Sequence, residues 1–207
     1  SDCSDEEIDF AIATGLARTR IDQTIFHLTN REMYLKYEGS VDSGFEIVSI
    51  PMKPEVYLLE RYKKLFTALS EANMFAGKNS YFSSGLHFHF SKAWFTNKDH
   101  AERVNAELTK IYQNGELCEI ANRTTKALIE YSKPTSRILN DEEDREVAMS
   151  ERANTYEFRF FASTINYERF TLCMAFILFL IDNTKESPID YYSKEYIEFR
   201  YKLKRTY

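Results

Sequence analysis

Polar and apolar residues alternate in the middle of the chain, over residues 84–91. There His87 and His89 alternate with Phe88 and Phe90, directly after a glycine. Successive side chains of a β-strand point to opposite faces, so this order predicts a strand with both imidazoles on one face and both phenyl rings on the other. One face of the strand is therefore expected to hold functional side chains, and the other to pack in the core.

The same pattern recurs in two further stretches of the chain. Residues 154–161 place Glu157 and Arg159 on one face of a predicted strand and apolar or aromatic residues on the other. Residues 44–49 place Glu46 opposite its apolar neighbours. We therefore expect three strands that each present ionisable groups to one surface of a sheet.

Apolar residues at helical spacing predict several helices around these strands. The clearest helix begins at Pro54, because proline is common at the first helical position, and continues through Leu69. Four more are expected at 104–111, 117–128, 170–181 and 191–205. Two short runs rich in aromatic and branched residues, 24–28 and 32–37, indicate strands instead. This order of elements favours an α+β fold, with a curved, mostly antiparallel sheet and helices packed on one of its faces.

The length and composition indicate an ordinary globular protein. The 207 residues suit a single domain spanning 1–207, and 43% of them are hydrophobic. Within this domain, residues 141–150 are expected to form an exposed or mobile loop, because their first part is highly charged. The first residue is Ser1 rather than methionine, so we expect the chain to be processed or to be part of something longer.

Charge and cysteine content exclude several classes of protein. A net charge of -5 and a pI of about 5.5 argue against nucleic-acid binding, which usually needs a basic face. The three cysteines, Cys3, Cys118 and Cys173, are far apart in the sequence, so we expect neither a zinc site nor a disulfide framework. We expect instead a reducing, cytoplasmic location. The most apolar run, 170–181, has about 12 residues where a bilayer needs roughly 20, so no membrane partner is expected.

Together, the three predicted strands would offer a set of groups that suits magnesium and a polyphosphate. The carboxylates of Glu46 and Glu157 are the oxygen ligands that Mg²⁺ takes, and His87 and His89 would lie beside them. The Arg159 guanidinium would hold phosphate oxygens in a bidentate fork. The constellation is more informative than any of its members.

Each member also has a simpler interpretation. The two histidines could be solvated residues without a function, Glu157 and Arg159 could form a surface ion pair, and Glu46 could be an isolated surface residue. A metal-dependent hydrolase or oxygenase that uses the two histidines is a further alternative. It is disfavoured because Lys92 and Ala93 stand where a cupin-like oxygenase needs a carboxylate, and because a (β/α)₈ hydrolase needs about 250 residues.

Three segments of the chain, 39–51, 85–89 and 155–161, resemble the amidoligase family, which is related to glutamine synthetase and the glutamate–cysteine ligases. Their order and spacing agree with that family over roughly residues 36–182, including the helix after the proline and the apolar helix after the last strand. The resemblance implies a fold similar to the catalytic domain of glutamine synthetase. It also implies an ATP-dependent ligase that joins a carboxylate to an amine or ammonia through an acyl-phosphate.

The resemblance implies a role for each matching residue. Glu46, Glu157 and His87 would be ligands of Mg²⁺, and His87, His89 and Ser91 would bind the phosphates of ATP.

The resemblance also implies roles for two arginines. Arg159 would contact the ATP phosphates and steady the transferring phosphoryl group, and Arg152 would bind phosphate or the substrate carboxylate. A simpler interpretation makes Arg152 a solvated loop residue.

One departure from the family pattern favours an alternative function. Family members usually begin with a strand that bears a Glu-x-Glu pair, whereas Glu6 and Glu7 lie in the pattern of a helix start. The chain is therefore expected either to lack its N-terminal strand or to be a catalytically inactive ligase-fold protein that serves as a binding or structural component. A homo-oligomer or a larger assembly would fit both.

Overall fold

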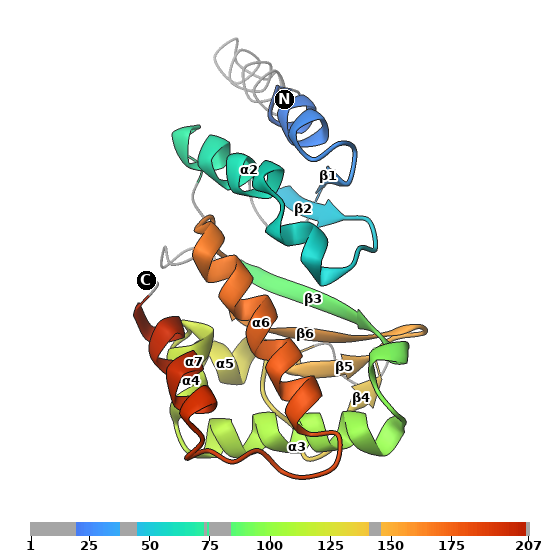
Figure 1. Ribbon diagram of the computed structural model, residues 1–207, viewed down its shortest axis with the longest axis vertical. Coiled ribbons are helices and arrows are strands. Elements are labelled where there is room, and N and C mark those ends of the chain that lie inside the picture. Colours follow the sequence, from blue (N-terminus) through green and yellow to red (C-terminus); the bar gives the residue numbers. More distant parts are fainter. Residues whose placement is uncertain (1–19, 38–44, 73, 75–83, 141–145, 206–207) are drawn as a thin grey trace, which may run out of the picture. The chain divides into compact units, whose positions relative to one another are not determined.

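The computed structural model describes residues 20–37, 45–72, 74, 84–140 and 146–205. The chain forms two compact units, Ser1–Asn73 and Met74–Tyr207, and each is described by itself (Figure 1). Cys3, the Glu6 and Glu7 pair and residues 38–44 lie outside the described residues.

The described residues of the first unit form two α-helices, one 3₁₀ helix and a two-stranded sheet. Its described elements are helical residues 20–28, β1 (Met33–Tyr37), β2 (Phe45–Ser49), the 3₁₀ helix η1 (Pro54–Leu58) and α2 (Glu60–Glu71). β1 and β2 pair in antiparallel fashion, with Met33 opposite Ser49. Among the described residues β2 pairs with β1 alone, so the prediction of three functional strands in one sheet is wrong.

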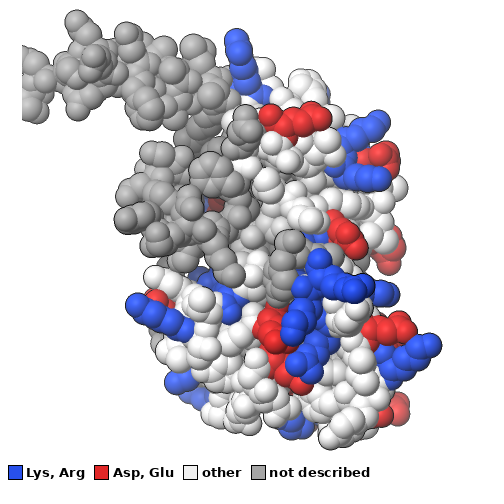
Figure 2. Space-filling model, turned by 90° about the vertical axis from the view of Figure 1, so that its left-hand side faces the viewer, with Lys and Arg blue, Asp and Glu red and all other residues white. Residues whose placement is uncertain are grey.

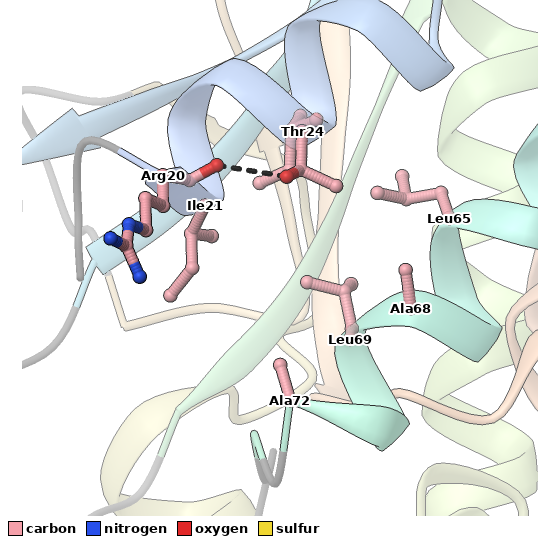
Figure 3. Close-up of a pocket in the computed structure, with 8 residues that line it drawn as sticks. Arg20, Ile21, Thr24, Leu65, Ala68, Leu69 and Ala72 are labelled. Carbon is pink, nitrogen blue, oxygen red and sulfur yellow. Dashed lines mark hydrogen bonds between the residues drawn. The ribbon is translucent and has the colours of Figure 1, made fainter.

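The strand predicted at 24–28 is also wrong, because this segment is helical. Ile21, Ile25 and Leu28 recur at a spacing of three or four residues, which gives a helix one apolar stripe, and Ile25 is fully buried. Figure 3 shows the pocket between this helix and α2, lined mainly by apolar side chains such as Leu65 and Leu69. Packing of that stripe outweighs the strand preference of individual branched residues.

The described residues of the second unit form a four-stranded sheet, five α-helices and one 3₁₀ helix. Its described elements are β3 (Gly85–Ser91), the 3₁₀ helix η2 (Lys92–Trp94), α3 (Lys98–Gln113), α4 (Glu116–Ala121), α5 (Thr125–Tyr131), β4 (Leu139–Asn140), β5 (Met149–Glu151), β6 (Thr155–Ala162), α6 (Tyr167–Asn183) and α7 (Lys194–Arg205). The strand order is β3-β6-β5-β4. β6 is antiparallel to both β3 and β5, whereas β4 and β5 are parallel. The predicted α+β class with a mostly antiparallel sheet is therefore confirmed, and the sheet is open.

Aromatic side chains join the sheet to α6, which lies across it in Figure 1. The ring of Phe88 on β3 lies 5.6 Å from that of Phe170, and the ring of Phe161 on β6 lies 6.4 Å from that of Phe176. The expected burial of the 170–181 helix is confirmed, with Phe176 fully buried. None of the helices in the described part of the chain is long and apolar enough to cross a bilayer.

Two further boundaries differ from the expectation. The segment 117–128 forms α4 and α5 rather than one helix, because Asn122 adopts a left-handed conformation with φ of 54° and ends α4. In the loop expected at 141–150, residues 141–145 lie outside the described part, but 147–150 are buried. Val147, Ala148 and Met149 are apolar and lead into β5, which explains their burial.

Candidate functional site

The site is built on β3, whose two faces differ as the sequence predicts. His87 and His89 are exposed, whereas Phe88 and Phe90 are buried. β3 pairs with β6 so that His89 lies opposite Glu157. The histidines and Glu157 therefore share one face of the sheet, which confirms this part of the sequence prediction.

Glu157 lies at the centre of a cluster on that face, although only 3% of its surface is exposed. Its Oε1 atom lies 3.2 Å from His87 Nδ1 and 3.6 Å from His89 Nε2. Its Oε2 atom accepts a hydrogen bond of 2.8 Å from Arg152 Nε, a second and shorter one from Arg152 Nη2, and one of 3.4 Å from Ser150 Oγ. We refer to Glu157, His87, His89, Arg152 and Ser150 as the Glu157 cluster.

The surroundings keep the Glu157 carboxylate charged. Burial raises its pKa, but hydrogen bonds from His87 and Arg152 and the charges of His87 and His89 lower it by more, so the pKa lies well below its usual value. A buried carboxylate that is charged at neutral pH is the kind of group that binds a cation or orients a neighbouring base.

This lowered pKa predicts how stability depends on pH. The usual pKa is 4.5 and the pKa in the folded protein is lower. Glu157 should therefore stabilise the protein fully above about pH 4.5, and this contribution should decrease progressively as the pH falls below 4.5. We expect the free energy of unfolding in urea to fall more between about pH 5 and about pH 3 in the wild type than in Glu157→Gln. Equal losses in the two proteins would contradict this explanation.

Arg159 does not pair with Glu157, so the surface ion pair considered for these residues is wrong. The register of β6 explains this: Phe88 lies opposite Phe158, but Leu86 lies opposite Phe161, so β6 has one additional residue at this point. Such a β-bulge redirects side chains. The Arg159 Nε atom is buried and has no hydrogen-bond partner among the described residues.

The other predicted site residues have different surroundings. Arg152 is an ion-pair partner of Glu157 rather than a solvated loop residue. Ser91 Oγ accepts a hydrogen bond of 3.3 Å from the backbone N–H of Ala93 and so caps η2. Glu46 lies on β2 of the first unit, where its Oε2 atom is 3.4 Å from Lys36 Nζ. A shared site of Glu46 and the Glu157 cluster stays a prediction.

The cluster offers a limited set of metal ligands. No group of three or more His, Cys, Asp or Glu side chains in the described part of the chain is arranged to hold a metal ion. Mg²⁺ in nucleotide sites is commonly bound through one or two carboxylates and the substrate phosphates. Glu157 can supply one such carboxylate through Oε1, which faces His87 and His89, whereas Arg152 and Ser150 contact its Oε2 atom.

Arg123, which sequence reasoning missed, lies next to this face. It follows the left-handed Asn122 and is buried, and its Nη2 atom donates a hydrogen bond of 3.1 Å to the Phe161 carbonyl. A Cβ atom on Gly85 would lie 2.9 Å from both Arg123 Nη2 and His87 Nε2. No sequence signal marks an arginine after a short helix as part of a site, because only the turn at Asn122 directs it there.

No protein-family model and no curated protein matches this chain. The resemblance to amidoligases therefore stays a prediction that rests on the three segments.

On the face drawn in Figure 2, acidic and basic side chains are interspersed among the described residues.

Proposed function

We propose that this protein is an ATP-dependent carboxylate–amine ligase, with a fold like the catalytic domain of glutamine synthetase. The observation that best supports this function is Glu157, a buried and charged carboxylate held against two imidazoles on one face of a sheet. The family resemblance requires this association of the Glu-x-Arg strand with the His-x-His strand.

In this proposal, Mg²⁺-ATP would transfer its γ-phosphoryl group to the substrate carboxylate and release ADP, and an amine or ammonia would then displace phosphate from the acyl-phosphate. Glu157 would hold the cation through Oε1, because a hard cation prefers a charged oxygen ligand. His87 and His89, partly exposed beside that oxygen, face the phosphates. Arg159 would stabilise the negative charge on the phosphoryl oxygens, because its buried Nε atom has no hydrogen-bond partner among the described residues.

A second candidate function is a binding or structural role without catalysis. Its support is the pair of hydrogen bonds from Arg152 to Glu157 Oε2. An arginine that neutralises a buried carboxylate can stabilise β6 against the preceding loop without any metal. The Glu-x-Glu strand that family members usually carry would separate the two candidates, but in this sequence Glu6 and Glu7 stand in the pattern of a helix start, and both lie outside the described residues.

An assay of ADP release tests the proposed function. The purified chain would be incubated with Mg²⁺-ATP, hydroxylamine as the amine and a series of small carboxylates; an acyl-phosphate would then release phosphate and form a hydroxamate. We expect ADP and hydroxamate to appear together with at least one carboxylate, and Arg159→Gln to lower the rate by a factor of about 100. Arg137→Gln, at an exposed position, is the control and should keep the rate.

The outcomes separate the two candidates. ADP release that depends on the carboxylate supports the ligase, whereas Mg²⁺-ATP binding without ADP release across the whole series favours the binding role. A chain that does not bind Mg²⁺-ATP contradicts the ligase.

A further inference from the structure

A second arginine, Arg123, is buried close to Arg159. Only 9% of its surface is exposed, yet its Nε atom has no hydrogen-bond partner among the described residues. Its position is well defined, because its backbone N–H donates to the Cys118 carbonyl at 3.1 Å and its Nη2 atom donates to the Phe161 carbonyl. The side chain is therefore held against β6 at Phe161, which follows Arg159 by two positions along the strand.

The two guanidinium groups share more than their location. The Nε atoms of both Arg123 and Arg159 are buried and without a hydrogen-bond partner in the described part of the chain. Burial lowers the pKa of Arg123, and the positive charge of Arg159 lowers it further. The two like charges thus destabilise each other in a partly desolvated place.

Buried charges in proteins are normally paired, because an unpaired charge is costly to remove from water. Here two buried Nε donors are unused, and the nearby Glu157 carboxylate is engaged by Arg152 and His87 rather than by Arg123 or Arg159. A guanidinium presents its N–H groups in a planar fork that matches the two oxygens of a carboxylate or phosphate. An external oxyanion would satisfy both Nε donors and remove the repulsion.

We propose that Arg123 and Arg159 together bind an oxyanion, the carboxylate or phosphate group of a small ligand, beside Gly85 and His87. Gly85 allows the Arg123 guanidinium and the His87 imidazole to lie close to the strand backbone, since a Cβ atom there would meet both at 2.9 Å. The proposal does not depend on ligase activity, because a ligase-fold protein without catalysis could keep the same anion site.

Titration of the whole chain with two simple anions tests this site. Inorganic phosphate and glutarate would each be added in the absence of ATP and Mg²⁺, with calorimetry and with nuclear magnetic resonance of the arginine Nε–H groups. We expect saturable binding of at least one anion, with shifts of the Arg123 and Arg159 Nε–H signals. Binding of phosphate alone indicates a phosphoryl subsite, whereas binding of glutarate alone indicates a substrate carboxylate subsite.

Three variants complete the test. Arg159→Gln and Gly85→Ala should each weaken binding of the preferred anion at least tenfold, the first by removing a donor and the second by displacing Arg123 or His87. Arg137→Gln removes an equal charge from an exposed position and should leave the affinity unchanged. The site is overturned if neither anion binds the wild type saturably, or if Arg137→Gln weakens binding as much as Arg159→Gln.

Discussion

Replacement of Phe158 with alanine is expected to lower the free energy of unfolding by about 4 kcal/mol. Phe158 is fully buried on β6, opposite Phe88, and its ring lies 5.9 Å from that of Phe90. Alanine would remove this aromatic contact and leave a cavity that rigid strands on either side cannot close. The Glu157 cluster lies on the other face of the sheet, so the loss concerns the scaffold.

Urea denaturation of the wild type and Phe158→Ala measures this effect. Tyr192→Ala is the matched control, because Tyr192 is 91% exposed and its loss should change stability by at most about 0.5 kcal/mol. A loss of less than about 1 kcal/mol in Phe158→Ala would contradict the central place of Phe158 in the core.

The alternation of residues along β3 and β6 allowed the sequence to predict most of the candidate site. A strand has a side-chain period of two residues, so His87, His89 and Glu157 could be assigned to one face before their pairing was known. The burial of Phe88 and Phe90 follows from the same rule. The apolar helix α6 was predictable as well, because the number of its apolar residues suits a buried helix rather than a membrane span.

Other features cannot be predicted from the alternation of residues along a strand. The β-bulge in β6 adds one residue before Phe161, so Phe161 rather than Phe160 lies opposite Leu86. The sequence gives no sign of that additional residue, and alternation beyond Arg159 is therefore predicted incorrectly. Which strands pair is a long-range property too, and this is why β2 with Glu46 was expected in the same sheet as β3.

The contacts of the arginines were the least predictable part. Arg152 was weighed as a solvated residue, but the return of the chain from β5 into β6 brings it to Glu157 Oε2. Arg123 depends on the left-handed turn at Asn122, which ends α4 early. In both cases the course of the backbone through a turn, rather than the spacing of residues along the sequence, decides where the charge lies.

Glu157→Gln is expected to weaken the Mg²⁺-dependent binding of ATP by at least about tenfold, which corresponds to about 1.4 kcal/mol. Glutamine keeps the shape and one acceptor oxygen, but a neutral amide is a poor ligand for a hard cation. The variant also leaves Arg152 without its anionic partner. It should therefore lose up to about 3 kcal/mol of stability, and binding has to be measured well below its unfolding temperature.

Glu151→Gln is a suitable control for this variant. Glu151 lies on the neighbouring strand β5 and forms an ion pair of 2.7 Å with Lys92, but it is not part of the Glu157 cluster. Its replacement removes one carboxylate charge from the same sheet, so a general electrostatic effect would appear in both variants. We expect the ATP affinity of Glu151→Gln to stay within about twofold of the wild type.

Calorimetric titration of the wild type and Glu157→Gln with ATP, with and without Mg²⁺, tests the proposed site most directly. The proposed function predicts saturable binding to the wild type that requires Mg²⁺, and a Glu157→Gln variant whose affinity for ATP no longer responds to Mg²⁺. Mg²⁺-dependent binding that is unchanged in the folded variant would contradict the assignment of Glu157 as the metal ligand, and the absence of ATP binding to the wild type would contradict the ligase function itself.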